Sequence, residues 1–531
     1  MKKQIISILT TLVYTAIVYY LFYPAINIHS FGFWVYLMSI LLVFSITQIP
    51  SLLGDIELLF TNRVKKRKNH TYKLLLVIPA ILLGIIIINI ICSPFFNAKT
   101  YYKRITVEEG NFEEEVKEVD FNKLPLLDRK STLKIGDRTM GQMSELVSQF
   151  DVSDQYTQIN YKNEIIRVTP LEYNGFIKWI TNRKNGIKAY ITVNSTTGSA
   201  KLIKMNKGMK YAPSAYYNEN LYRKLQFSYP TKIFESINFE IDNDGNPYWI
   251  ASSVKYVGVG LRREVEGIVI FDPITGKSKY YDVKDVPSWV DHVYEADLIL
   301  EQVADWGKFK NGYWNSIISQ KEVVETTTGY NYLAQDDDIY LYTGITSVIS
   351  DESNIGFILT NLRTKETKFY GVAGAEEYSA MDSAEGQVQQ MKYQSTFPLL
   401  INLNGRPTYL VSLKDNAGLV KMYGFVDVVD YQKVVVTDSS KGIEKAAEAY
   451  LNEIGEDKSS ATNEKTITID TIKTVIIDGD TYYYFTDQQE QKYKVSIKVA
   501  KDILPFLKEG DTITIAYRKQ QEVISITEII S

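Results

Sequence analysis

The chain has 531 residues, of which 45% are hydrophobic, and a formal net charge of -4 at pH 7. This length is enough for several domains with real hydrophobic cores. A single cysteine excludes a disulfide framework and a cysteine-based zinc site, and three histidines argue against a histidine-rich metal enzyme. Aromatic residues make up 13% of the chain and are mostly tyrosine, which favours strands.

Three apolar stretches near the N-terminus, at residues 5–25, 33–49 and 74–91, approach the roughly 20 residues that cross a bilayer as a helix. Backbone polar groups in hydrocarbon must be bonded within their own segment, so we predict three membrane-spanning helices. The first stretch is longer than the apolar part of a signal peptide, and we interpret it as a retained anchor. Residues 51–60 are expected to lie along the inner membrane surface as a short amphipathic helix.

Basic residues between the second and third stretches predict the orientation. Arg63, Lys65, Lys66, Arg67 and Lys68 lie there, whereas the loop after the first stretch carries no Lys or Arg. The positive-inside rule places the basic loop in the cytoplasm and, with three spans, places residues from about 94 onward outside it. That outer part is net acidic, so we expect no nucleic-acid partner, because nucleic-acid binding needs a basic surface.

A pattern of strands and turns recurs four times between residues 175 and 436. Each copy has an aromatic strand, a second apolar strand, a tight turn and a third strand, and helices are expected at 140–150, 288–306 and 374–391. The unit is therefore a helix on an antiparallel meander, which is an α+β arrangement. The copies begin at Gly175, Gly245, Asp337 and Gly405, and their aromatic strands centre on Trp179, Trp249, Tyr340 and Tyr409.

The second copy contains a hairpin with the pattern Asp-x-x-Thr-Gly between two strands, which reads IFDPITGK from Ile270 to Lys277. Together with the helix and the antiparallel sheet, this hairpin resembles PepSY-type domains over about residues 136–436. The resemblance implies small extracytoplasmic modules of bacteria that bind peptides or envelope components, or that modulate peptidases. It implies no catalytic residues.

The C-terminal segment is separate from the repeats. A helix at 441–454 and a polar linker at 455–465 precede five predicted strands and a helix near 499–507, an order similar to an OB-fold barrel. Alternation along the second strand puts Tyr482 and Tyr484 on one face and Tyr483 and Phe485 on the other. One pair fills the barrel core and the other is a candidate ligand platform; we assign Tyr482 and Tyr484 as the candidate contacts. The predicted strands are 466–477, 481–487, 491–497, 511–518 and 522–530.

The sequence contains no recognisable catalytic motif: G-x-S-x-G, H-E-x-x-H and the P-loop are all absent. His292, the one histidine outside the membrane segments, is interpreted as structural rather than as a general base. The acidic run at 242–244 is interpreted as a turn, because Ala251 stands where a calcium loop needs glutamate. We therefore expect no catalytic residues, no cofactor and no metal.

The predicted fold class is an N-terminal α-helical membrane module with three spans, followed by α+β repeats and a small β-barrel. We expect a non-enzymatic, membrane-anchored extracytoplasmic binding or modulating protein of the bacterial plasma membrane, which contacts the lipid bilayer and a protein or peptide partner. The alternatives are a sensor or structural subunit of a membrane complex and, last, an envelope enzyme of unfamiliar type. The predicted domains are an anchor at 1–93, a charged connector at 94–135, repeats one and two at 136–286, repeats three and four at 287–454, a linker at 455–465 and the barrel at 466–531.

Overall fold

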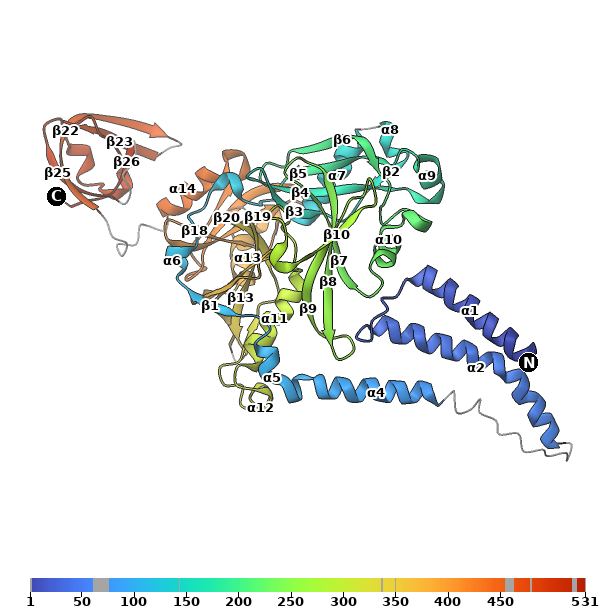
Figure 1. Cartoon of the computed structure of the whole chain (residues 1–531). Coiled ribbons are helices and arrows are strands. Elements are labelled where there is room, and N and C mark those ends of the chain that lie inside the picture. The colour runs from blue at the N-terminus through green and yellow to red at the C-terminus, as the bar shows by residue number, and fades with distance from the viewer. Residues whose placement is uncertain are drawn as a thin grey trace. The chain divides into compact units, whose positions relative to one another are not determined.

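The computed structural model describes residues 2–60, 76–142, 144–335, 338–348, 350–453, 463–477, 480–517 and 523–530. The chain forms two compact units, Met1–Ala446 and Ala447–Ser531, which are described separately here. The described residues contain 13 α-helices and several sheets that are almost entirely antiparallel (Figure 1).

The prediction of a three-span membrane module is wrong. The N-terminal helices are α1 (Lys2–Phe22), α2 (Phe31–Phe60), α4 (Val77–Cys92) and α5 (Pro94–Tyr102). Among the described residues, the part of α1 from Ile5 to Phe22 is the one helix long and apolar enough to cross a membrane. A second span is present only if α4 and α5, which are bent by 48° relative to each other, count as one.

Helix length explains the correction. Helix α4 has 16 residues, which at about 1.5 Å per residue extend about 24 Å, short of the roughly 30 Å of hydrocarbon in a bilayer. Ser93 ends α4 with an extended backbone, and Pro94 begins α5 in a new direction. The apolar part of α2, Phe31–Thr47, is also too short, and the helix expected separately at 51–60 is its continuation.

The N-terminal helices contact the sheets of the same unit through backbone and amide hydrogen bonds. In the loop after α1, the Ile26 N–H donates to the Pro230 carbonyl at 2.7 Å. The Asn89 side chain of α4 both accepts from the Val259 N–H, at 2.8 Å, and donates to its carbonyl, at 3.1 Å. Gly258 permits this approach: its φ is +69°, and a Cβ there would lie 2.8 Å from the Asn89 Oδ1.

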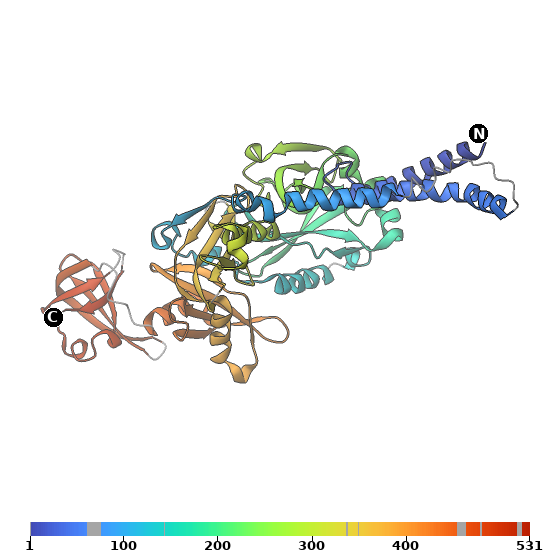
Figure 2. The same cartoon turned by 90° about the horizontal axis from the view of Figure 1, so that it is seen from below.

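Four sheets make up the rest of the first unit and follow one another in chain order, coloured from cyan to orange (Figures 1 and 2). The first has the order β2-β4-β5-β6, with β3 also paired to β4, and the second has the order β10-β9-β8-β7. Their strands are β2 (Phe150–Val152), β3 (Thr157–Tyr161), β4 (Glu164–Tyr173), β5 (Ile187–Asn194), β6 (Ala200–Met209), β7 (Ile233–Ile241), β8 (Pro247–Val257), β9 (Leu261–Phe271) and β10 (Ser278–Asp282).

The third sheet has the order β1-β15-β14-β13-β11, with β12 paired to β13 and β16 to β14, and the fourth has the order β17-β19-β20-β21, with β18 paired to β19. Strand β1 pairs in parallel with β15, so the segment expected as a connector at 94–135 adds a strand to this sheet. The strands are β1 (Val107–Gly110), β11 (Val324–Thr326), β12 (Asn331–Gln335), β13 (Asp338–Ser347), β14 (Ser350–Asn361), β15 (Thr367–Tyr370), β16 (Gly374–Ala375), β17 (Gln394–Ser395), β18 (Leu399–Leu403), β19 (Arg406–Lys414), β20 (Val420–Asp427) and β21 (Val434–Asp438).

The same turn follows the central strand of each sheet. The Oδ1 atom of Asn194, Asp272, Asn361 or Asp427 accepts the backbone N–H groups two and three residues later, at 2.8–3.2 Å. In the third sheet Lys365 takes the left-handed φ of +67° that Gly276 takes in the second. The turn geometry is therefore retained where the Asp-x-x-Thr-Gly pattern is not.

The first copy departs from the prediction, because Trp179 lies in helix α9 rather than in a strand. The helix predicted at 288–306 begins only at Ala296, since the Asp291 and His292 N–H groups donate to the Glu240 carboxylate instead of entering a helix. The remaining helices are α6 (Phe112–Glu115), α7 (Arg129–Gly141), α8 (Ser144–Val147), α9 (Gly175–Asn182), α10 (Leu221–Ser228), α11 (Ala296–Phe309), α12 (Tyr313–Ile317), α13 (Glu377–Gly386) and α14 (Ile443–Glu453), with short 3-10 turns at Phe121–Lys123, Tyr217–Glu219, Val283–Asp285, Gln389–Met391 and Ser439–Lys441.

The second unit contains a closed five-stranded barrel with the order β22-β23-β24-β26-β25. Its core includes Phe485 and Tyr493, which are 1% and 0% exposed. The helix expected near 499–507 is replaced by two 3-10 turns, Ile497–Val499 and Leu504–Phe506. The strands are β22 (Asn463–Ile477), β23 (Asp480–Asp487), β24 (Lys492–Ser496), β25 (Thr512–Tyr517) and β26 (Val523–Ile529).

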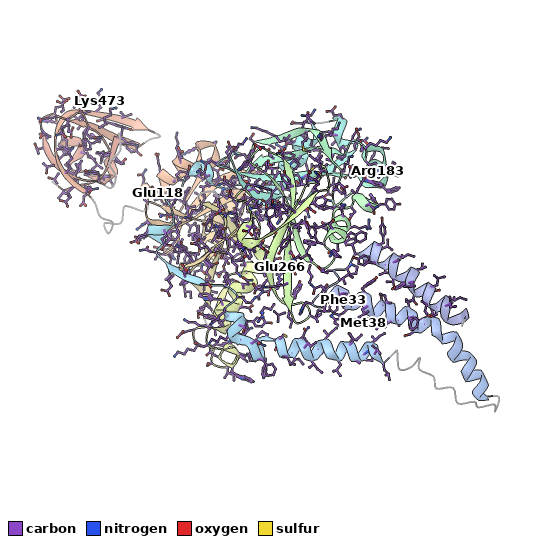
Figure 3. The ribbon with its side chains drawn as sticks, in the orientation of Figure 1. Phe33, Met38, Glu118, Arg183, Glu266 and Lys473 are labelled. Carbon is purple, nitrogen blue, oxygen red and sulfur yellow. The ribbon has the colours of Figure 1, made fainter. Side chains whose placement is uncertain are left out.

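A half-buried ion pair ties β9 to the start of β7. Glu266, labelled in Figure 3, accepts from Lys232 Nζ at 2.8 Å and from Ser253 Oγ at 2.9 Å. Burial raises the pKa of the Glu266 carboxyl, but the hydrogen bonds outweigh burial and leave the pKa below its usual value. A lowered carboxyl pKa adds stability above the pKa of the unfolded chain, and that stability is lost as the pH falls.

We expect Glu266→Gln to lower the free energy of unfolding by about 1–2 kcal/mol at neutral pH. The matched control is Glu145→Gln, because the ion pair of Glu145 with Lys204 has side chains 68% and 65% exposed; it should change the free energy by less than about 0.5 kcal/mol. Urea unfolding at neutral and acidic pH measures both, and the Glu266 effect should shrink below about pH 4. Equal losses in the two variants would contradict the assignment.

Candidate functional site

A cavity of about 440 Å³ lies where the four sheets of the first unit meet. Its wall includes residues of β3 and β4 from the first sheet, β7 from the second, β12 from the third and β18 and β19 from the fourth. The turn before α7 and the segment before α11 complete the wall. Because each of the four sheets contributes residues to it, this cavity is a site that the sheets share.

Two arginines line this cavity, the exposed Arg129 at the start of α7 and the buried Arg167 on β4. The neighbours of Arg167 along the strand, Ile166 and Val168, point to the opposite face and are buried in the hydrophobic core of the first unit. The Arg167 guanidinium donates to Gln158 Oε1 from Nε at 3.2 Å and from Nη2 at 3.1 Å, and to Thr132 Oγ1 from Nη1 at 2.9 Å. Only 8% of the residue is exposed.

No carboxylate of the described residues pairs with Arg167. The Asp128 carboxylate, whose charge favours the Arg167 cation, is itself paired with Lys414 at 2.6 Å and also caps α7 by accepting the Ser131 N–H. Burial lowers the pKa of Arg167 to about 10, so the group still carries its charge at neutral pH. An unpaired buried cation is costly to the fold, because few compensating charges replace its hydration.

A second buried arginine in the same unit has the opposite surroundings. The Arg104 side chain is 2% exposed, and its guanidinium pairs with Glu264 at 3.0 Å, with Glu301 at 2.6 Å and with Asp305. It also donates to the Arg263 carbonyl at 2.8 Å. The fold therefore supplies three carboxylates to one buried arginine and none to the buried arginine that faces the cavity, which points to an external anion at Arg167.

Other polar groups on the wall complement such an anion or limit where it fits. The Gln158 Nε2 amide is buried and has no hydrogen-bond partner in the described part of the chain, so it is a second donor beside Arg167. Glu295 also lines the cavity and accepts from the Asn238 amide at 2.5 Å. The cavity thus offers donors at Arg167 and carboxylates at Glu295 and at Asp128, of which Asp128 is paired with Lys414. This arrangement suits a ligand with an anionic group and a separate donor or cationic group.

Glu240, on β7, holds the segment that carries His292 and Glu295. It is fully buried and accepts the Asp291 N–H at 3.0 Å and the His292 N–H at 3.1 Å. Burial raises the pKa of Glu240, and these backbone hydrogen bonds lower it by less. A ring nitrogen of His292 lies 2.7 Å from the Gln158 carbonyl oxygen, so this segment is bound to β3 as well as β7.

A second cavity of about 360 Å³ shares Gln155, Ile237 and Asn238 with the first. Tyr23, the residue after α1, and Tyr222 of α10 also line it. The two cavities therefore adjoin, and the second lies against the end of the apolar N-terminal helix.

Two polar side chains of the wall, Ser412 and His292, contact backbone carbonyl groups. In the ranges the structure describes, no group of three or more His, Cys, Asp or Glu side chains is placed to hold a metal ion. Ser412 Oγ, which lies in the wall, donates to the Leu126 carbonyl at 3.1 Å, and His292 contacts a backbone carbonyl rather than a hydroxyl.

The residues that the sequence singled out lie elsewhere. Tyr482 and Tyr484 are half-buried on the outer face of β23, and Tyr483 and Phe485 fill the barrel core. The Lys494 ammonium lies 4.6 Å from the centre of the Tyr482 ring. The basic residues assigned to membrane topology, Arg63, Lys65, Lys66, Arg67 and Lys68, fall outside the described residues.

Sequence reasoning missed Arg167, although one signal was available. The strand reads EIIRVTPLEY, in which a single arginine stands between two isoleucines and a valine in a run that becomes buried on both faces. A lone charge in such a strand is rarely buried without a partner. Gln158 lies only nine residues away in the sequence, but Thr132 lies 35 residues away and the cavity depends on four sheets meeting.

No family model matches this chain, and no curated protein matches it. Among solved structures, a crystal structure of an ACO/RPE65 chimera is similar with a TM-score of 0.13 and 9% sequence identity, over 53% of this chain and 47% of that one. This chain thus spans about half the length of that structure, and a similarity at this level carries no argument about fold or function.

Proposed function

We propose that this protein is a membrane-anchored, non-enzymatic binding protein whose cavity takes the anionic group of a protein or peptide partner, in the simplest case the carboxylate at a peptide C-terminus. The observation that carries the proposal is the buried guanidinium of Arg167, which lines a cavity of about 440 Å³ and has no carboxylate partner among the described residues. Charge-assisted hydrogen bonds from arginine to a carboxylate are among the stronger polar contacts in proteins.

The anchor in this proposal is α1, with the sheets on the extracytoplasmic side of a bacterial plasma membrane. Lys2 and Lys3 precede its apolar part, and the positive-inside rule favours the cytoplasm for that end. At its other end, the Tyr20 carbonyl accepts from Arg223 Nε at 2.8 Å, which joins the helix to α10 of the same unit. An extracytoplasmic module of PepSY type, engaged in binding or modulation, is in keeping with this arrangement.

The test is binding of defined probes to the full-length protein in detergent, by calorimetry and thermal shift. A short peptide with a free C-terminus, the same peptide amidated, succinate and inorganic phosphate are compared. Binding of the free peptide and not of the amidated one supports a peptide partner. Binding of phosphate alone assigns the same cavity to a phosphate-bearing ligand and overturns the peptide assignment, and binding of none of the probes overturns the proposal.

A further inference from the structure

A second surface of the first unit exposes large apolar side chains where α5 meets α12. Trp314, Ile317 and Ile318 are 62%, 53% and 75% exposed, and Phe95 and Phe96 of α5 are 44% and 62% exposed. The Phe95 ring lies 5.6 Å from that of Trp314. Scattered exposed apolar residues are ordinary, but a contiguous aromatic and aliphatic patch marks an interaction surface.

This patch, formed by Phe95, Phe96, Trp314, Ile317 and Ile318, continues directly from α4. Ser93 alone separates α4 from α5, and Figures 1 and 2 show α5 bending away from α4 beside α12. Helix α4 is itself apolar, and many of its side chains face outward: Leu82, Leu83, Ile86, Ile87, Ile88, Ile90 and Ile91 are each at least 43% exposed. An apolar helix that exposes such residues is compatible with hydrocarbon around it, so the patch begins where that helix ends.

The composition of the patch and its rim matches the surface layer of a bilayer. Tryptophan and tyrosine concentrate at the level of the lipid headgroups, where the ring is apolar at one end and wet at the other. Three exposed lysines lie in or near α5 and α12 in the sequence, Lys99 in α5, Lys308 near the end of α11 and Lys321 after α12, while Lys310 pairs with Glu322 at 3.0 Å. Each basic residue near an anionic membrane surface contributes about 1 kcal/mol of attraction.

We infer that the surface formed by Phe95, Phe96, Trp314, Ile317 and Ile318 inserts into the interface of a lipid bilayer and holds the sheets against the membrane. This inference rests on the membrane anchor proposed above, and it assigns a second, separate membrane contact to the domain. Such a contact restrains the orientation in which the Arg167 cavity meets its ligand.

The test uses the full-length protein with its single cysteine, Cys92, replaced by serine. Cysteine is introduced as Ile318→Cys, labelled with an environment-sensitive fluorophore, and the protein is reconstituted in vesicles of phosphatidylcholine and phosphatidylglycerol, with and without brominated acyl chains. The control is Val429→Cys, because Val429 is an aliphatic residue of the same unit that is 68% exposed, in the turn after β20.

The expected result is several-fold stronger quenching by brominated lipid at position 318 than at 429, with a blue-shifted emission that weakens when phosphatidylglycerol is left out. Ile317→Cys gives the same readout if Ile318→Cys fails to fold. Vesicle flotation separately measures whether the anchor holds the protein on the membrane. If the protein floats but quenching is equal at positions 318 and 429, this inference alone is overturned. If the protein does not float, both the proposed anchor and the inference are overturned. A blue shift without quenching means that a second copy of the chain covers the patch, and this result also overturns the inference.

Discussion

Replacing Arg167 with methionine is expected to weaken binding of a peptide C-terminal carboxylate by about 10- to 100-fold, because one or two charge-assisted hydrogen bonds contribute about 1.5–3 kcal/mol. Titration calorimetry on the full-length variant measures the change. The control is Arg183→Met, because Arg183, labelled in Figure 3, pairs with Glu219 at 2.8 Å and does not line the cavity. Equal affinities in wild type and Arg167→Met would contradict the assignment.

Loss of binding in this variant should not come from loss of the fold. Burial lowers the pKa of the Arg167 guanidinium to about 10, so the charge that Arg167 carries at neutral pH opposes folding. Removing that charge offsets the loss of its hydrogen bonds to Gln158 and Thr132. We expect a melting temperature close to that of the wild type in the absence of ligand, and a ligand-induced rise in the wild type alone.

Removing the charge of Glu295 should change the affinity for an anion in the opposite direction to removing the charge of Arg167. Glu295 lines the same cavity as Arg167, and its carboxylate repels an anion bound there. We expect Glu295→Gln to strengthen the binding of succinate or inorganic phosphate by about 2- to 5-fold at low salt, with the gain reduced as salt is added. Calorimetry at two ionic strengths measures this, and weaker binding in the variant would place Glu295 among the groups that hold the anion.

Local features of the fold were predictable from the sequence. The turn after Asp272 was recognised because its side-chain oxygen and the φ of Gly276 act within five residues. The strands of the barrel follow from alternation alone. Trp179 was misplaced because the same aromatic spacing fits a short amphipathic helix, and that helix begins at Gly175, whose φ is +82°.

Features that depend on distant residues were not predictable. The helix of residues 288–306 starts late because Glu240, about 50 residues earlier, takes the two N–H groups at its expected beginning. The number of membrane spans was overestimated because hydropathy registers an apolar stretch but not the length of the helix it forms, which is 16 residues in α4. Arg167 becomes a binding group only where strands of four sheets meet, and no window of the sequence contains that junction.

Replacing Arg104 with methionine is expected to destabilise the first unit severely, in contrast to Arg167→Met. The change leaves Glu264, Glu301 and Asp305 without their shared cation, and breaking a buried ion pair on one side costs about 3–5 kcal/mol. All six tryptophans lie between residues 34 and 314, so tryptophan fluorescence during urea unfolding reports this unit and not the barrel.

The pH dependence of the stability of Arg104→Met shows whether carboxylates left without their cation cause the destabilisation. Burial raises the pKa of Asp305 to about 6, although Arg104 pulls it downward. A carboxyl with a raised folded pKa favours the folded state as the pH falls through that value, and without Arg104 the pKa of Asp305 rises further. Arg104→Met should therefore regain stability between pH 7.5 and 5, and Arg104→Met combined with Asp305→Asn should regain part of it at neutral pH. If Arg104→Met and Arg167→Met cost the fold equally, the contrast between a compensated and an uncompensated arginine, on which the anion site depends, does not hold.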